Sequence, residues 1–385
     1  RALLYVPQSH SEKYGGSRME SGVSLYCRRV LIQSKAKNIL PEWLRFMKGA
    51  IDSESVPLNI SREHTQDGGT IRRLNAVLTK RCMKWMEEEA KRDRPKYERF
   101  IKEFGGFLKE GVCTDQVNKM DIAKLLRFET TSTDVDFPLV SLNEYVDRMQ
   151  PNQSHIYFIS APNKEMAMNS PYFEQYKENN LEVLVLTEPI DDFVMQHLDT
   201  YLKHKLQNIE LFDAANCGAV QHKKKLEDGK SAEKNADGSD KDVSIKKQLS
   251  DEQCKALSDF ITKRLLGRVG VVKSTGRLSD TPAIIADHEA AQMRKVYKMA
   301  GQAHGPPPKY NFHFNPKHDI IRKLYTLQCS TSNDQVETAG LIVEQLFDNA
   351  VIAAGLLDDP RSIVGRLNTI MTKMVADVAE PSKDQ

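Results

Sequence analysis

A stretch with almost no apolar side chains divides this chain and limits how it can fold. Between residues 221 and 242 only Leu226, Ala232 and Ala236 are apolar, and charged residues, glycine and serine dominate. Such a segment cannot bury enough apolar surface to offset the conformational entropy that folding removes. Acidic residues interrupt its lysines, which argues against a docking patch for an anionic partner. We therefore predict a disordered linker or surface loop with separately folded parts on either side.

Length and composition are those of a multidomain protein with sizeable cores. The chain has 385 residues, 40% of them hydrophobic and 28% charged, which predicts two or three domains. Its 55 Lys and Arg nearly balance its 53 Asp and Glu, so no strong overall field favours nucleic acid or membranes. The six cysteines are far apart and form no CxxC pair, which predicts reduced thiols without disulfides or structural zinc. No apolar run approaches the ~18 residues that a transmembrane helix needs.

The first part of the chain alternates strand and helix patterns. Residues 23–34 are rich in β-branched and aromatic side chains, which is typical of a strand. Apolar residues recur at helical spacing from Ile71 to Phe107, with a solvated face or a bend predicted around Pro95. Beyond them the pattern predicts a strand, a helix, a second strand and a further helix, at residues 155–159, 164–177, 182–186 and 192–202. Because such a crossover is right-handed and joins parallel strands, we predict an α/β sandwich with helices on both faces of the sheet.

The part after the charged stretch mixes helix and strand patterns. Ser250 is a good helix cap, and the helix that it opens is predicted to run to about Leu266, where Gly267 ends it. The residues VGVVKST (269–275) and PAIIAD (282–287) are typical of strands.

An amphipathic stretch comes after these strands. It places Met293, Val296 and Tyr297 on one face. Methionine adapts to varied apolar partners, so this face suits either the binding of other proteins or ordinary core packing.

The last two helix patterns are the clearest structural signal in the chain. The first helix is predicted to end at Gly355, and Asp359 and Pro360 suit the cap and the first position of the second. Each helix carries one apolar stripe, formed by Leu341, Ile342, Leu346, Ala350, Val351 and Ala354 and by Ile363, Val364, Leu367, Ile370, Met371, Met374, Val375 and Val378. Two helices this apolar need a partner, either the rest of the chain or a second subunit.

The segment ILPEWLRFMKGAIDSESVPLNISREHTQ, residues 39–66, carries an arginine in a setting that suits an anion. Ser61 is a good helix cap and Glu63 lies in the first predicted turn, so Arg62 is predicted to lie at a helix N-terminus. Free backbone N–H groups and the positive end of the helix dipole would face the same place as its guanidinium. This combination suits a phosphate, although the isolated triplet more often marks an ordinary surface arginine near a helix cap.

Common self-contained catalytic motifs are absent from the sequence. It has no GxxxxGK[ST], HExxH, GxSxG or GxGxxG, which are signatures of nucleotide, metalloprotease and hydrolase sites. The pair His313 and His318, with Asp319 next to it, lacks a further ligand at metal-binding spacing and is predicted to lie at the surface. We therefore expect no metal site.

Residues 39–66 resemble part of the middle domain of the heat-shock protein 90 family of ATP-driven chaperones. Five later segments are similar to the family in the same order: IAKLLRFET (122–130), SLNEYVDRM (141–149), IYFISAPN (156–163), SPYFE (170–174) and LEVLVLTEPIDDF (181–193). The segment DNAVIAAGLLDDPRSIVGRLN (348–368) looks closest to the mitochondrial branch, the tumour necrosis factor receptor-associated chaperone. The resemblance covers nearly the whole chain.

The resemblance implies a fold and a domain plan. Residues 1–212 would form the middle domain, an αβα sandwich of the ribosomal S5 domain 2 type. Residues 213–249 would be a charged linker or insertion, and residues 250–385 an α+β dimerisation domain that ends in a helix pair. The family's ATP-binding N-terminal domain would precede Arg1.

The resemblance also implies a catalytic role. Arg62 would contact the γ-phosphate of ATP held by that separate domain, with help from Gln66 and with Asn59 in the same loop. His64 and Thr65 stand where relatives usually have apolar residues. ATP and its magnesium would be bound mainly outside this chain, which alone should not hydrolyse ATP.

The family's assembly supplies further expectations. We expect a homodimer that acts on partly folded client proteins in the mitochondrial matrix, without nucleic acid or membrane partners. Its interface would include Leu346, Ala350, Ile363, Leu367, Ile370 and Met374, and client contacts would include Met293, Val296 and Tyr297. The final residues EPSKDQ differ from the acidic pentapeptide with which cytosolic relatives recruit co-chaperones. This difference favours the organellar branch.

Two other functional classes stay open at this point. A nucleotide-independent dimeric scaffold or binding module would keep the C-terminal stripe and have no use for Arg62. A DNA-acting ATPase with a similar transducer domain would need a basic groove and show strong salt dependence. The nearly balanced charge argues against the second of these.

Overall fold

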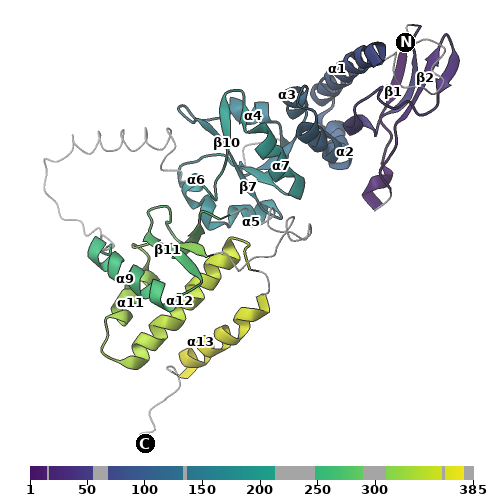
Figure 1. The fold of residues 1–385 in the computed structure, drawn as a ribbon. Helices are drawn as coiled ribbons and strands as arrows, with labels where there is room; N and C mark the ends of the chain where they lie inside the picture. Colours follow the sequence, from purple (N-terminus) through teal and green to yellow (C-terminus); the bar gives the residue numbers. More distant parts are fainter. Residues whose placement is uncertain are drawn as a thin grey trace, which may run out of the picture. The chain divides into compact units, whose positions relative to one another are not determined.

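The structure, a computed structural model, describes residues 1–14, 17–54, 68–132, 137–212, 248–288, 309–357 and 360–376. The chain forms two compact units (Figure 1), Arg1–Arg148 with Glu188–Leu206 and Met149–Thr187 with Gln207–Gln385. Unit 2 therefore takes in residues 149–187, which the sequence analysis places in the middle domain. The predicted linker lies almost entirely outside the described residues, so the predicted domain boundaries stay a prediction.

Unit 1 begins with a four-stranded sheet in the order β1-β4-β2-β3. Its strands are β1 (Ala2–Tyr5), β2 (Gly22–Cys27), β3 (Val30–Gln33) and β4 (Lys48–Asp52). Strand β4 runs antiparallel to β1 and parallel to β2. The prediction of one strand over residues 23–34 is wrong, because the segment is the hairpin of β2 and β3. Arg28 and Arg29 adopt φ angles of 48° and 66° and turn the chain.

Two long helices follow the sheet, α1 (Gly68–Arg92) and α2 (Arg94–Thr114). The bend predicted around Pro95 is a complete break between them. Asp93 caps α2 by accepting a hydrogen bond from the backbone N–H of Lys96 at 3.0 Å, and Pro95 suits the first turn of α2, where no N–H partner is needed.

Shorter elements complete unit 1. They are the 3-10 turns η1 (Ser11–Tyr14) and η2 (Glu42–Leu44), helices α3 (Lys119–Ala123), α4 (Leu142–Asp147) and α7 (Pro189–Leu198), and strands β5 (Phe128–Thr130), β6 (Leu139–Val140), β9 (Thr200–Tyr201) and β10 (His204–Asn208). Strands β5 and β6 pair antiparallel, as do β9 and β10. Helix α7 starts before the predicted residue 192 because Pro189 lies in its first turn and Glu188 and Asp191 form a capping box.

Unit 2 opens with the predicted strand–helix–strand unit. Strand β7 (His155–Ser160) pairs with β8 (Leu184–Leu186), and the two are parallel, as predicted. The predicted helix over 164–177 is divided into α5 (Lys164–Met168), η3 (Pro171–Phe173) and α6 (Glu174–Glu178). Ser170 followed by Pro171 explains the division, since Ser170 caps η3 and proline cannot continue the preceding helix.

The C-terminal part of unit 2 is a three-stranded sheet with helices packed against it (Figure 1). Strands β11 (Val269–Ser274), β13 (Tyr310–Phe314) and β12 (Ala283–Ala286) lie in that order. Helices α9 (Asp251–Arg264), α11 (Asp319–Gln328) and α12 (Asn333–Ala353) contact one another, and α9 and α12 contact the sheet. The chain continues through η5 (Pro360–Ile363) to α13 (Val364–Ala376), which contacts α12. The predicted starts and stops at Ser250, Gly267 and Gly355 are confirmed.

Hydrogen bonds join the two parts of unit 2. The carboxylate of Glu174 accepts bonds from the backbone N–H groups of Ser279 and Asp280 at 2.9 and 3.3 Å. The hydroxyl of Thr281 donates to the same carboxylate. Buried apolar residues from both parts form one continuous core cluster. The carboxylate therefore ties α6 to the turn before β12.

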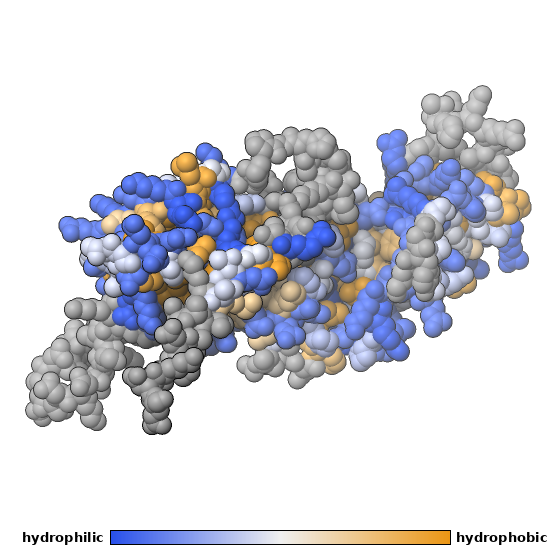
Figure 2. Space-filling model, turned by 90° about the horizontal axis from the view of Figure 1, so that it is seen from below, coloured by the Kyte–Doolittle hydropathy of each residue, from blue (hydrophilic) through white to orange (hydrophobic). Residues whose placement is uncertain are grey.

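On the face shown in Figure 2, the hydrophobic residues among those that the structure describes lie in groups between hydrophilic ones. Helices in the described part of the chain are either too short or too polar to cross a bilayer.

Candidate functional site

The predicted catalytic residues and the predicted client residues lie outside the described residues; they are Asn59, Arg62 and Gln66, and Met293, Val296 and Tyr297. The structure does describe both ends of the catalytic segment. Glu54 after β4 precedes residues 55–67, and α1 follows them. The residues that hold these two ends therefore belong to the described part of the chain.

An apolar anchor fixes the chain just before β4. Trp43 and Phe46 are 1% and 0% exposed. The indole N–H of Trp43 donates to a carboxylate oxygen of Asp115 at 3.1 Å, so the buried ring leaves no polar atom unsatisfied. A Cβ at Gly111 on α2 would lie 2.8 Å from the Trp43 ring. Glycine is thus required where the ring meets the helix.

An ion network covers the outer side of this anchor. The guanidinium of Arg45 donates to Glu12 at 2.8 Å and pairs with Glu110 at 2.7 Å, and it lies 4.6 Å from the centre of the Phe107 ring. The hydrogen bond from Arg45 lowers the pKa of Glu12 from 4.5 to about 2. These charged side chains therefore cover the edge of the apolar core around the anchor.

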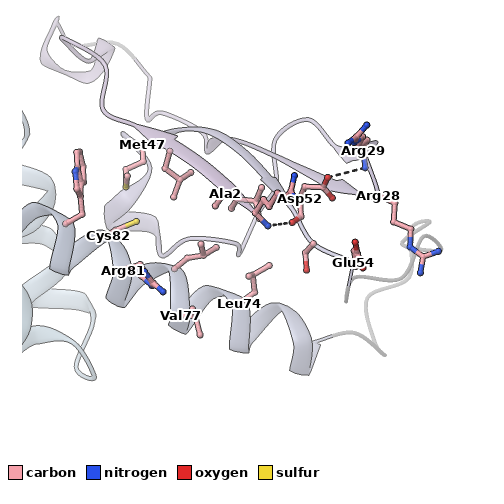
Figure 3. Close-up of a pocket in the computed structure, with 16 residues that line it drawn as sticks. Ala2, Arg28, Arg29, Met47, Asp52, Glu54, Leu74, Val77, Arg81 and Cys82 are labelled. Carbon is pink, nitrogen blue, oxygen red and sulfur yellow. Dashed lines mark hydrogen bonds between the residues drawn. The ribbon is translucent and has the colours of Figure 1, made fainter.

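An open groove of about 1000 Å³ lies between the sheet and α1 and reaches Glu54, where the catalytic segment begins (Figure 3). Four arginines, Arg1, Arg28, Arg29 and Arg81, line it together with Asp52 and Glu54. Its apolar lining includes Leu4, Met47, Leu74, Val77, Leu78 and Trp85. The backbone N–H of Arg29 donates to Asp52 at 3.2 Å, which ties the hairpin turn to the end of β4.

The arginines of this groove were not predicted from the sequence. The signal was present as the doublet Arg28–Arg29, which interrupts an otherwise strand-like segment. Arginines beside a chain segment that carries a further arginine suit an anionic ligand. Among the described residues, no group of three His, Cys, Asp or Glu side chains is placed to hold a metal ion.

The predicted dimer residues differ in how far they are exposed. Leu346 and Ala350 on α12 are 6% and 2% exposed and belong to the chain's own core. Ile363 is also buried, and Ile370 is half-buried. Leu367 is 37% exposed and continues an outward stripe with Val364 and Met371, at 49% and 55%. The side chain of Met374 lies outside the described residues.

Comparison with known proteins gives a consistent result over the whole chain. Residues 1–385 match the family described as Hsp90 protein. The chain is 40% identical over 379 residues to TNF receptor-associated protein 1 homolog, mitochondrial, of Dictyostelium discoideum, which covers 97% of this chain and 50% of that protein. It is 40% identical over 373 residues to chaperone protein HtpG of Desulfitobacterium hafniense, with 97% and 57% covered. Heat shock protein 75 kDa, mitochondrial, of Bos taurus is 39% identical over 383 residues, with 97% and 51% covered.

The chain thus spans about half the length of the curated relatives that it matches. The family match nevertheless runs from its first residue to its last. This chain belongs to the Hsp90 family.

Proposed function

We propose that this chain is the middle and C-terminal part of an ATP-dependent molecular chaperone of the mitochondrial branch, acting in the mitochondrial matrix. The observation that carries the proposal is the segment of residues 39–66 inside a family match that covers the whole chain. Two similar proteins that are named mitochondrial support the branch.

In this proposal Arg62 acts on ATP that another part of the full-length protein binds. Its guanidinium stabilises negative charge on the γ-phosphate as hydrolysis proceeds, and Gln66 and Asn59 belong to the same loop. The groove that reaches the start of this loop fits such a role, because four of its lining residues are arginines and two are carboxylates. Magnesium would be held with the nucleotide outside this chain, so the chain alone should not hydrolyse ATP.

The proposed assembly is a homodimer through the C-terminal helices. The outward stripe of α13 supports it, since Val364, Leu367 and Met371 are exposed in one chain. A helix face of this kind gains about 25 cal/mol for each Å² of apolar surface that a second copy covers. Leu346 and Ala350 would act by supporting that face from within.

The proposed client surface is the amphipathic face of Met293, Val296 and Tyr297. Replacing all three with serine should weaken the suppression of a model client's aggregation while the dimer persists. Unchanged suppression would assign this face to core packing or to bystander surface.

Turnover in the full-length protein tests the catalytic proposal. Arg62→Ala should leave ATP binding nearly intact and lower the hydrolysis rate by about ten- to a thousandfold, as expected when one charge-stabilising donor is lost. Arg62→Lys should restore little activity, because a point charge cannot reproduce the planar fork. Arg73→Ala is the matched control, since this exposed arginine of α1 does not line the groove.

A wild-type rate in Arg62→Ala would contradict the phosphate-contacting role. A nucleotide-independent dimeric scaffold would then be the better interpretation, because it keeps the exposed stripe of α13 and needs no arginine at position 62.

A further inference from the structure

Helix α13 meets α12 through charged as well as apolar side chains. Arg366 lies between the outward-facing residues Val364 and Leu367 in sequence, yet its own side chain is only 23% exposed. It is directed at two acidic residues of α12, Glu344 and Asp348, which are one helical turn apart. The side of α13 that faces α12 is therefore held partly by an arginine.

Asp348 is the most buried member of this cluster. The residue is 1% exposed, and its carboxylate accepts a hydrogen bond from Arg268 at 2.6 Å and another from Arg366. Arg268, from the turn before β11, also stacks over the ring of Phe347 at 4.4 Å. A carboxylate buried this deeply needs such partners, because an uncompensated buried charge is strongly destabilising.

Glu344 is the second point of attachment. It pairs with the Nε of Arg366 at 3.0 Å and with the Nε of Arg264 on α9 at 2.8 Å. A Cβ at Gly340 would lie 2.8 Å from Arg264, so glycine makes room for that side chain. Three arginines thus form ion pairs with two carboxylates, and Arg366 pairs with both of them.

This sharing gives Arg366 a separable role. If it is removed, Asp348 keeps Arg268 and Glu344 keeps Arg264, so each acid retains a cationic partner. The charged contact that disappears is the one between α13 and α12. A lysine at the same position has one ammonium group and cannot reproduce a fork that reaches two acids.

We propose that Arg366 is a positioning residue for assembly: it holds α13 against α12 so that Val364, Leu367 and Met371 present one continuous face to a second copy of the chain. The inference rests on the proposed homodimer. In this view the ion pairs of Arg366, on the inner side of α13, set the orientation in which the apolar outer side meets a second copy of the chain.

The dimer dissociation constant of the full chain, measured by sedimentation equilibrium, gives the main test. Arg366→Gln should weaken the dimer by about tenfold to a hundredfold, the range for losing hydrogen bonds between charged groups. Arg366→Lys should recover only part of that loss. Arg264→Gln is the matched control, because it removes the other partner of Glu344 and leaves α13 attached. It should change the constant by less than about fivefold, as for a partly exposed ion pair.

A second measurement separates this proposal from the dimer itself. Leu367→Asp places a charge on the outer stripe and should give a monomer in which α13 is still seated. Hydrogen exchange of the α13 backbone should be slow in that variant and fast once Arg366→Gln is added.

Each outcome decides one question. A monomeric wild-type chain would overturn the proposed homodimer, and the exchange experiment would still report on the seating of α13. Unchanged exchange and an unchanged dissociation constant in Arg366→Gln would overturn the positioning role. Equal weakening by Arg264→Gln would also overturn it, because the cluster would then act as a general stabiliser.

Discussion

Two elements next to the proposed functional regions are fixed by opposite means. The chain entering the catalytic segment is held by Trp43 and Phe46, which are almost completely buried among apolar neighbours. Helix α13 is held to α12 with the help of Arg366, while its apolar residues Leu367 and Met371 face outward. The first arrangement buries its apolar surface inside one chain, and the second leaves apolar surface exposed.

This contrast shows what each kind of contact is suited to. Buried apolar surface is non-directional and contributes most of the stability of a core. Paired charges add little net stability when buried, but they fix orientation, and removing one partner is costly. An anchor needs the first property, and a helix that must present a face needs the second.

Removal of the Trp43 ring should have the strongest effect on stability. Trp43→Ala should lower the free energy of unfolding by about 3–5 kcal/mol, because it empties a fully buried aromatic site. Trp85→Ala is the matched control, since Trp85 is 39% exposed in the groove, and it should cost about 1 kcal/mol or less. Urea denaturation followed by circular dichroism measures both. Equal losses in the two variants would mean that Trp43 is not the anchor.

Alanine substitutions at two glycines of α2 should have smaller effects on stability, and the two effects should be opposite in sign. In Gly111→Ala the new Cβ would lie 2.8 Å from the Trp43 ring, which should cost about 1–3 kcal/mol. In Gly106→Ala, also within α2, the Cβ meets no atom within 4 Å, so the better helix former should stabilise by up to about 1 kcal/mol. Thermal denaturation compares them. Stabilisation by both changes would show that α2 moves easily away from Trp43.

The smallest effect concerns the charges outside the anchor. Glu12 has a folded-state pKa of about 2 against 4.5 ordinarily, so its stabilisation is fully present above pH 4.5 and is lost as the pH falls through 2. Glu12→Gln should therefore cost about 1 kcal/mol at pH 7, since the carboxylate is partly exposed and Arg45 keeps Glu110. The difference from wild type should shrink between pH 4.5 and 2 in urea titrations. A constant difference across that window would assign the loss to packing.

Structural features that leave a signal in a short stretch of sequence were predicted correctly. Ser250 as a cap, Gly355 as a stop and the parallel pairing of β7 with β8 are confirmed. Each leaves a local signal, such as a capping side chain, a glycine or a regular apolar spacing.

The sequence did not predict what depends on contacts between distant residues. Arg28 and Arg29 line the same groove as Arg81, some fifty positions later, and the partners Arg268 and Asp348 are 80 residues apart. No short pattern records such pairings. The hairpin of β2 and β3 was missed for another reason, since arginine rarely adopts the positive φ that such a turn requires. The roles of Asn59, Arg62 and Gln66 remain predictions.

The partners of the Glu174 carboxylate are synthesised long after Glu174 itself. Its partner Thr281 lies 107 residues further along the chain, and a ribosome adding about 5–20 residues per second needs roughly five to twenty seconds to make that stretch. During this interval α6 exists without the turn that it binds, and the neighbouring aromatic residues Tyr172 and Phe173, 4% and 5% exposed in the finished fold, lack their final cover. A nascent chain of this protein therefore passes through a period in which it presents the kind of apolar surface that chaperones recognise.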